Sequence, residues 1–141
     1  MKDLIYVIGL SKFGASVASI LSSNGKDVVA IDLDEKSFSK LDENYGGMKI
    51  TGDALDLSFL EENEIMKADK VVIAVRDDNA NIFLANLCDI IFKIPKIYVR
   101  LNRKDQEGIL NSKNIKPIYP FRLSLDYFLN MLGEKNENSN C

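Results

Sequence analysis

The stretch from Leu4 to Gly14, LIYVIGLSKFG, decides the fold of this 141-residue chain. Its first five residues form an apolar run, typical of a parallel strand that is covered on both faces. Gly9 then permits a tight turn, and Gly14 permits the following helix to approach the strand closely. Ser11 stands where the G-x-G-x-x-G fingerprint has its second glycine. The order of strand, glycine turn and helix predicts a dinucleotide-binding βαβ unit.

A second apolar run, Val28–Ile31, is followed directly by Asp32. In the fingerprint, an acid roughly 20 residues after the turn accepts hydrogen bonds from ribose hydroxyls. The N-terminus of the first helix offers unpaired N–H groups to phosphate, and Lys12 in the turn adds a positive charge. Asp32 could instead cap the next helix, although Asp34 is better placed for that, and Lys12 could be an ordinary surface lysine.

The rest of the chain alternates between strand-like and helix-like segments. This pattern predicts an α/β fold, a Rossmann-like doubly wound parallel six-stranded sheet in a single domain. We assign residues 1–133 to a nucleotide-binding domain and residues 134–141 to a polar tail. The further strands are expected at 48–51, 70–75, 97–100 and 115–119, and the helices at 13–23, after Asp34, around 57–60, from 77 to about 92, at 103–112 and at 123–132.

In an open parallel sheet, ligands bind outside the carboxyl ends of the strands. The candidate binding residues follow those ends, and they are Gly9, Leu10, Ser11, Lys12, Phe13, Gly14, Asp32, Asp53, Ala54, Val75 and Arg100. Two of them have a structural alternative, because Asp53 could cap the short helix that follows it and Arg100 could form an ion pair. We expect Asp77 and Asp78 to begin a helix rather than contact a ligand. We assign no catalytic residue and no metal ligand.

Composition excludes several classes of protein. The net charge is −3 and the basic residues are scattered, so a nucleic-acid partner is not expected. The N-terminal apolar run is interrupted at Gly9, and no apolar run approaches the ~20 residues of a membrane span. Cys88 and Cys141 have neither metal-ligand spacing nor the pattern of a disulfide scaffold. These features predict a cytoplasmic protein.

Several of these segments closely resemble one family. The turn Gly9–Gly14, the second strand with Asp32, the element Gly52-Asp53-Ala54, the run Asp77–Asn79 and Arg100 are similar to the N-terminal domain that regulates potassium conductance, a TrkA-N-like domain. The resemblance covers about residues 2–132. The family usually has glycine where Ser11 stands, arginine where Lys12 stands and often glutamate where Phe121 stands.

This resemblance implies a cytoplasmic regulatory subunit of a Trk or Ktr potassium uptake system, or a domain of a ligand-gated channel. Such a subunit senses an adenine nucleotide. The candidates are NAD(H) and ATP/ADP, with AMP as a further candidate. It gates a membrane potassium transporter or channel subunit from the inner face of the cell membrane. Two other classes remain open, a small NAD-dependent oxidoreductase or its cofactor-binding fragment, and a scaffold that has lost its ligand. The enzyme is disfavoured because the chain has no histidine and no substrate domain.

Two helical segments, Ile82–Phe92 and Leu123–Leu132, are apolar on more than one face. A helix of this kind needs more than one covering surface. Closed symmetric pairing would bury the same patch on both protomers, so we expect a homodimer or a larger ring. Leu84 and Leu129 are predicted to lie in this interface.

Overall fold

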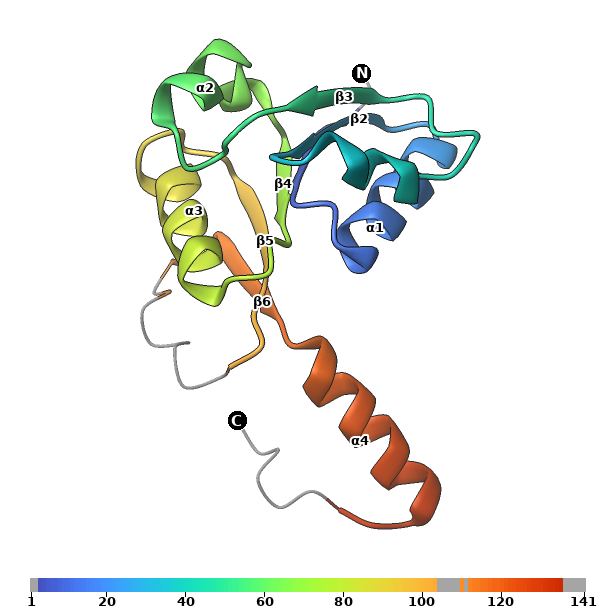
Figure 1. Ribbon diagram of the computed structural model, residues 1–141. Coiled ribbons are helices and arrows are strands. Elements are labelled where there is room, and N and C mark those ends of the chain that lie inside the picture. The colour runs from blue at the N-terminus through green and yellow to red at the C-terminus, as the bar shows by residue number, and fades with distance from the viewer. Residues whose placement is uncertain (1–2, 104–109, 111, 136–141) are drawn as a thin grey trace.

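The computed structural model describes residues 3–103, 110 and 112–135, and it has a six-stranded sheet in the order β3-β2-β1-β4-β5-β6 (Figure 1). All neighbouring strands pair in parallel. The prediction of a Rossmann-like doubly wound sheet is therefore confirmed. The strands are β1 (Leu4–Ile8), β2 (Asp27–Asp32), β3 (Met48–Thr51), β4 (Lys70–Ile73), β5 (Lys96–Arg100) and β6 (Ile115–Ile118).

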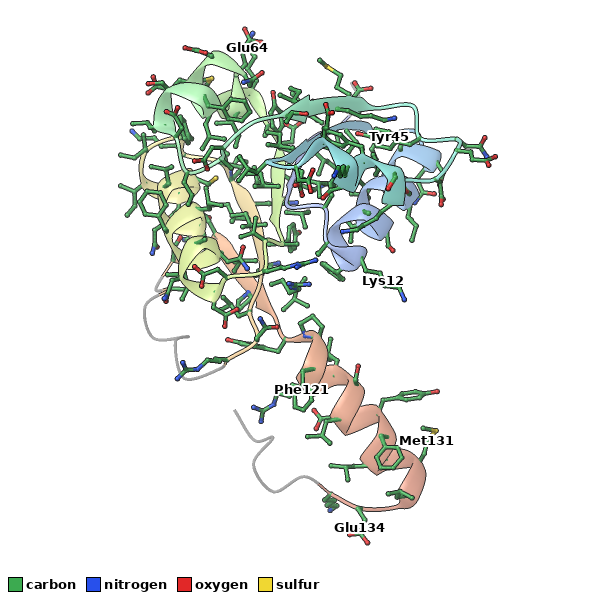
Figure 2. All side chains as sticks on the ribbon, viewed as in Figure 1. Lys12, Tyr45, Glu64, Phe121, Met131 and Glu134 are labelled. Atoms are coloured by element: carbon green, nitrogen blue, oxygen red, sulfur yellow. The ribbon has the colours of Figure 1, made fainter. Side chains whose placement is uncertain are left out.

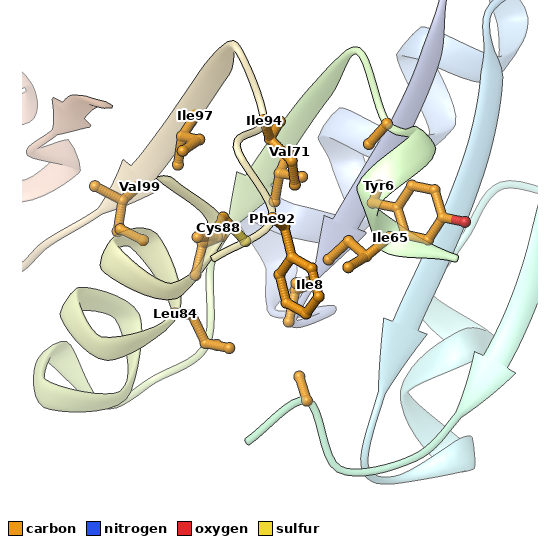
Figure 3. Close-up of a cluster of buried hydrophobic side chains, with 14 of the residues drawn as sticks. Tyr6, Ile8, Ile65, Val71, Leu84, Cys88, Phe92, Ile94, Ile97 and Val99 are labelled. Carbon is orange, nitrogen blue, oxygen red and sulfur yellow. The ribbon is translucent and has the colours of Figure 1, made fainter. Parts of the chain in front are cut away.

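Helices cover both faces of this sheet (Figure 1). On one face, α1 (Lys12–Ser23) packs Ala15 and Ala18 into a cluster with buried residues of β1 and β2. On the other face, α3 (Asp78–Ile90) packs Leu84 and Cys88 against β4 and β5, as Figure 3 shows. The short helices α2 (Leu57–Glu62) and η2 (Ile65–Lys67) complete that layer through Leu60 and Ile65. Burial on both faces explains why the central strands β1, β2 and β4 carry apolar runs without alternation.

The structure differs from the sequence-based expectation in the second helix. Residues Glu35–Lys40 form the 3-10 helix η1, which has no buried residue. Asp34 caps it as expected, since its carboxylate accepts a hydrogen bond from the Lys36 amide at 3.0 Å. Leu41, directly after the helix, is buried, and Phe38 packs partly buried against the same cluster, so both face inward as the sequence predicts.

Two further predicted helices concern the region after β5. The last helix, α4 (Pro120–Leu132), begins three residues earlier than predicted, because proline suits the first turn of a helix. The helix expected at 103–112 falls largely outside the described residues.

Helix α4 projects away from the sheet beyond β6 (Figures 1 and 2). None of its residues is buried. Its large apolar side chains are exposed, namely Phe121, Leu123, Leu125, Tyr127, Phe128, Met131 and Leu132. No helix among the described residues is long and apolar enough to cross a bilayer.

Helix α3 corrects part of the predicted assembly surface. Leu84 is 1% exposed and Ile82 is buried too, so both belong to the core and cannot contact another subunit. Ile90 and Ile91 are exposed, as is Phe83. The sequence pattern could not separate the two faces, because both are apolar.

Candidate functional site

The glycine turn after β1 rests directly on the end of β4. Gly9 has φ +92°, and a β-carbon there would lie 2.6 Å from the Ala74 carbonyl carbon and the Val75 nitrogen. A β-carbon on Gly14 would overlap the Gly9 carbonyl oxygen. Both glycines are therefore required by close approach, as the sequence predicts, and Gly9 also by its backbone angle.

Ser11 directs its side chain toward β4. Its hydroxyl donates a hydrogen bond to the Ala74 carbonyl at 3.0 Å and accepts one from the Gly14 amide at 3.3 Å, which makes Ser11 the N-cap of α1. The Arg100 guanidinium donates to the same hydroxyl at 3.3 Å. These contacts explain how the turn accommodates a side chain where the fingerprint has glycine.

Asp32, at the end of β2, holds the turn in place. One carboxylate oxygen accepts a hydrogen bond from the Leu10 amide at 2.7 Å, and the other accepts one from the Asp34 amide at 2.9 Å. Asp32 does not cap η1, since Asp34 does. Each carboxylate oxygen has two lone pairs, so Asp32 retains acceptor capacity for hydroxyl donors.

A cavity of about 390 Å³ opens beside the turn, at the carboxyl ends of β1 and β2 and beyond β4. This is the position where strand order reverses in a doubly wound sheet. Its volume falls within the range of small-molecule sites. The lining residues are Gly9, Leu10, Ser11, Asp32, Leu33, Asp34, Ser37, Lys40, Ala74, Val75 and Arg76.

Two cations in this lining, Lys40 and Arg76, were not among the predicted site residues. The Lys40 ammonium donates a hydrogen bond to the Leu10 carbonyl at 3.0 Å, and so reaches the turn from η1. No signal in the sequence indicated this, because Lys40 lies well beyond the end of β2. Arg76 directly follows the predicted strand 70–75, at a strand end where ligand contacts are expected, but only Val75 was assigned to the site there.

The other predicted residues do not line the cavity. They are Lys12, Phe13, Gly14, Asp53, Ala54 and Arg100. Lys12 is exposed and points into solvent (Figure 2). Phe13 packs against the α1 side of the core, and Ala54 is buried on the opposite side.

Asp53 is exposed, and its carboxylate accepts a hydrogen bond from the Leu55 amide at 2.9 Å. Asp56 is the N-cap of α2, so the alternative that assigned this cap to Asp53 is wrong.

Arg100 and Asn81 join the end of β4 to the end of β5. The fully buried Asn81 side chain accepts a hydrogen bond from the Val75 amide at 3.0 Å and donates to the Val75 and Arg100 carbonyls, both at 2.8 Å. Arg100 also donates to the Val75 carbonyl at 3.3 Å. Within the described residues Arg100 has no ion pair, which leaves the ion-pair alternative without support.

Asp77 and Asp78 begin α3, as predicted. Asp77 caps the helix, and Asp78 accepts hydrogen bonds from the Asn102 and Arg103 amides, each at 2.9 Å. The loop after β5 is thereby attached to α3.

Comparison with known proteins identifies a family. The TrkA-N domain family model matches residues 5–119. The Trk system potassium uptake protein TrkA of Streptomyces coelicolor is 27% identical over 128 residues, and the TrkA homologue of Methanothermobacter thermautotrophicus is 29% identical over 124 residues. These alignments cover 91% and 87% of this chain, and 57% of each relative. The chain thus spans little more than half the length of these relatives.

Solved structures share the fold. The TrkA-N domain of the inner membrane protein ybaL from Escherichia coli has a TM-score of 0.79 at 13% identity, covering 94% of this chain and 98% of that one. The GsuK channel bound to NAD has a TM-score of 0.78 at 22% identity, covering 94% of this chain and 23% of that one. The Kef C-terminal domain of Shewanella denitrificans, in an AMP-bound form, has a TM-score of 0.68 at 20% identity, covering 94% and 84%.

Proposed function

This chain belongs to the TrkA-N domain family, and we propose that it binds an adenine nucleotide in the cavity beside the glycine turn and acts as the regulatory part of a potassium uptake system. One observation carries the proposal. The glycine turn and the Asp32 carboxylate are hydrogen-bonded to each other and line the same cavity, which lies where the strand order of the sheet reverses. The candidate ligands are NAD, NADH, ATP, ADP and AMP. The proposed partner is a membrane potassium transporter or channel subunit, contacted at the inner face of the membrane.

The polar groups of the cavity suit a nucleotide. Asp32 can accept hydrogen bonds from ribose hydroxyls. The Gly14 amide is used by Ser11, but the Lys12 and Phe13 amides lack partners within the helix, and Ser11, the N-cap before them, lines the cavity, so this end of α1 favours phosphate. The Asp32 carboxylate would repel a 2′-phosphate. This charge pattern favours NAD(H) and the adenosine phosphates over NADP(H).

The names of similar proteins agree with this proposal. The relatives from Streptomyces coelicolor and Methanothermobacter thermautotrophicus are named as Trk potassium uptake proteins. Among the proteins with the same fold, one is a channel bound to NAD and one is a domain bound to AMP.

Calorimetric titration tests the proposal. The unmodified chain should bind NAD(H) or an adenosine phosphate more tightly than NADP(H). Asp32→Ala should weaken the binding by roughly 1–3 kcal/mol, because charge-assisted hydrogen bonds are lost. Asp32→Asn should keep an acceptor for the Leu10 amide and mainly relieve the repulsion of NADP(H). Asp42→Ala, at an exposed acid outside the cavity, is the matched control. Tighter binding of NADP(H) by the unmodified chain would contradict the proposal.

The oxidoreductase alternative has less support. The chain lacks histidine, and Tyr45 and Lys49 supply a Tyr-x-x-x-Lys spacing outside the cavity. The Tyr45 hydroxyl donates to the Met48 carbonyl at 2.7 Å, and burial raises the pKa of Tyr45 to about 12, which suits a structural role. An absorbance assay for nicotinamide reduction with candidate alcohols would detect the enzyme if it exists.

A regulatory protein transmits its ligand state through contact with another subunit, and α4 offers a surface for such a contact. Its exposed apolar side chains would be covered by the same helix of a second copy in a homodimer or larger ring. The exposed Ile90, the last residue of α3, and Ile91 directly after it would extend this contact. Leu84 takes no part, because it is in the core.

A further inference from the structure

We propose that Arg76 selects nucleotides by their phosphates, by pairing its guanidinium with a phosphate group held beside the glycine turn. This inference rests on the nucleotide site proposed above. It transfers the phosphate-charge role from Lys12, to which the sequence analysis assigned it, to a residue after β4 that lines the cavity.

The backbone contacts place Arg76 next to the turn. Arg76 follows Ala74 and Val75, the two residues against which Gly9 packs. The Ala74 carbonyl also accepts the hydrogen bond from the Ser11 hydroxyl at the start of α1. Arg76 lines the cavity together with Gly9 and Ser11. A phosphate held in this cavity at Ser11, the N-cap of α1, would therefore have the Arg76 side chain among its neighbours.

The other nearby cations are engaged or point elsewhere. Lys40 donates to the Leu10 carbonyl, and Arg100 donates to Ser11 and Val75 and does not line the cavity. Lys12 is exposed and also lies outside the lining. Within the part of the chain that the structure describes, no hydrogen bond or ion pair is formed by the side chain of Arg76, which is exposed. Lys40 uses one of its three ammonium donors on the turn, so Arg76 is the cavity cation whose donors are all available to a ligand.

The charges of the cavity suit a ligand with two chemically different ends. Asp32 and Asp34, which are negatively charged, line the same cavity as the positively charged Arg76. A ligand must therefore offer hydroxyl donors to the two acids and an anion to the guanidinium. A nucleotide does both, through its ribose and its phosphates. A guanidinium presents five donors in a rigid fork that fits phosphate with two parallel hydrogen bonds, which a lysine cannot do. A nucleoside without phosphate would use the acidic end only.

The experiment measures the affinities of ATP, ADP, AMP and adenosine for the unmodified chain and for Arg76→Gln, Arg76→Lys and Lys12→Gln. Lys36→Gln serves as a control of equal charge change, since Lys36 is exposed and does not line the cavity. Arg76→Gln should weaken ATP and ADP binding by ~10–100-fold, the range expected when charge-assisted hydrogen bonds are lost. Adenosine binding should change less than about twofold. Arg76→Lys should recover part of the affinity, and Lys12→Gln and Lys36→Gln should have little effect.

The outcomes distinguish this inference from the proposed function. If the unmodified chain binds ATP with dependence on Asp32 but Arg76→Gln leaves the ATP to adenosine ratio unchanged, the role of Arg76 is overturned and the nucleotide site stands. If Lys12→Gln reduces that ratio instead, the sequence-based assignment was correct. If the unmodified chain binds none of these ligands or NAD(H), both proposals fail.

Discussion

Helices α1 and α4 have similar lengths, 12 and 13 residues, but their surroundings differ. Helix α1 begins at a side-chain cap, Ser11, and buries residues including Ala15 and Ala18 against the sheet. Helix α4 begins at Pro120 without a side-chain cap and buries no residue. Contacts within the subunit therefore hold α1 in place. Within the described residues, no other segment buries the apolar side chains of α4. This contrast separates a region that builds the cavity from a region suited to a partner.

The largest effect on stability is expected when the same substitution, leucine to alanine, is made once at a buried position and once at an exposed position. Leu84→Ala, in the core side of α3, should lower the free energy of unfolding by ~2–5 kcal/mol, because it removes buried methyl groups and leaves a cavity. Leu123→Ala, at a side chain of α4 that is 62% exposed, should change it by less than ~0.5 kcal/mol. Denaturant unfolding of both variants at a concentration where the chain is monomeric measures the difference. Equal losses would show that α4 packs within its own subunit.

The link between β4 and β5 should give the next largest effect. Asn81→Ala removes the partners of three backbone groups, on Val75 and Arg100, and should destabilise the chain by ~2–3 kcal/mol. Asn79→Ala, at an exposed position of the same helix, is the matched control and should be nearly neutral. Thermal unfolding compares the two variants. A small effect of Asn81→Ala would mean that water replaces the amide and that the end of β4 is held by other contacts.

A tyrosine pair extends the comparison to pH. The one O–H of Tyr45 donates to the Met48 carbonyl at 2.7 Å, with the Val28 carbonyl as a longer second acceptor at 3.3 Å, so Tyr45→Phe should cost ~1 kcal/mol at neutral pH. Burial raises the pKa of Tyr45 to about 12, above the value of about 10 in the unfolded chain. The stabilisation that the protonated Tyr45 hydroxyl contributes to the fold is therefore fully present below pH 10, and it is lost as the pH rises from 10 toward 12.

Tyr127, on α4, is 69% exposed, and Tyr127→Phe should change the free energy of unfolding of the monomer by less than ~0.5 kcal/mol. Urea unfolding at pH 8 and at pH 11 measures both variants. If the difference between Tyr45→Phe and the unmodified chain does not shrink at the higher pH, the pKa shift of Tyr45 is wrong.

The smallest effect on stability, and the clearest effect on assembly, is expected on α4. Phe128→Glu replaces an apolar side chain that is 52% exposed, so the fold should keep its free energy of unfolding within ~0.5 kcal/mol. The proposed homodimer should dissociate, since the charge would lie in the interface. Light scattering measures the mass, and Asn130→Glu, at an exposed polar residue, is the control. A monomeric unmodified chain at high micromolar concentration would remove the dimer proposal.

The sequence by itself determined the order of the elements and the glycine turn. A strand, a Gly9 turn, a helix and an acid at the next strand end are local patterns, and their conformational preferences act over a few residues. The cap at Asp34 and the start of α3 at Asp77 follow the same local rule.

Only the tertiary structure decided which side chains meet in the cavity and which face of α3 is buried. Lys40 reaches the turn because η1 returns to it, and Arg76 lines the same cavity as Gly9 because β4 pairs with β1, so both depend on contacts between distant segments. Leu84 is buried and Ile90 exposed although both are apolar, because the position of the sheet, not hydrophobicity, selects the face. Local patterns limit the conformation of each segment, but they do not fix the long-range distances on which a binding site depends.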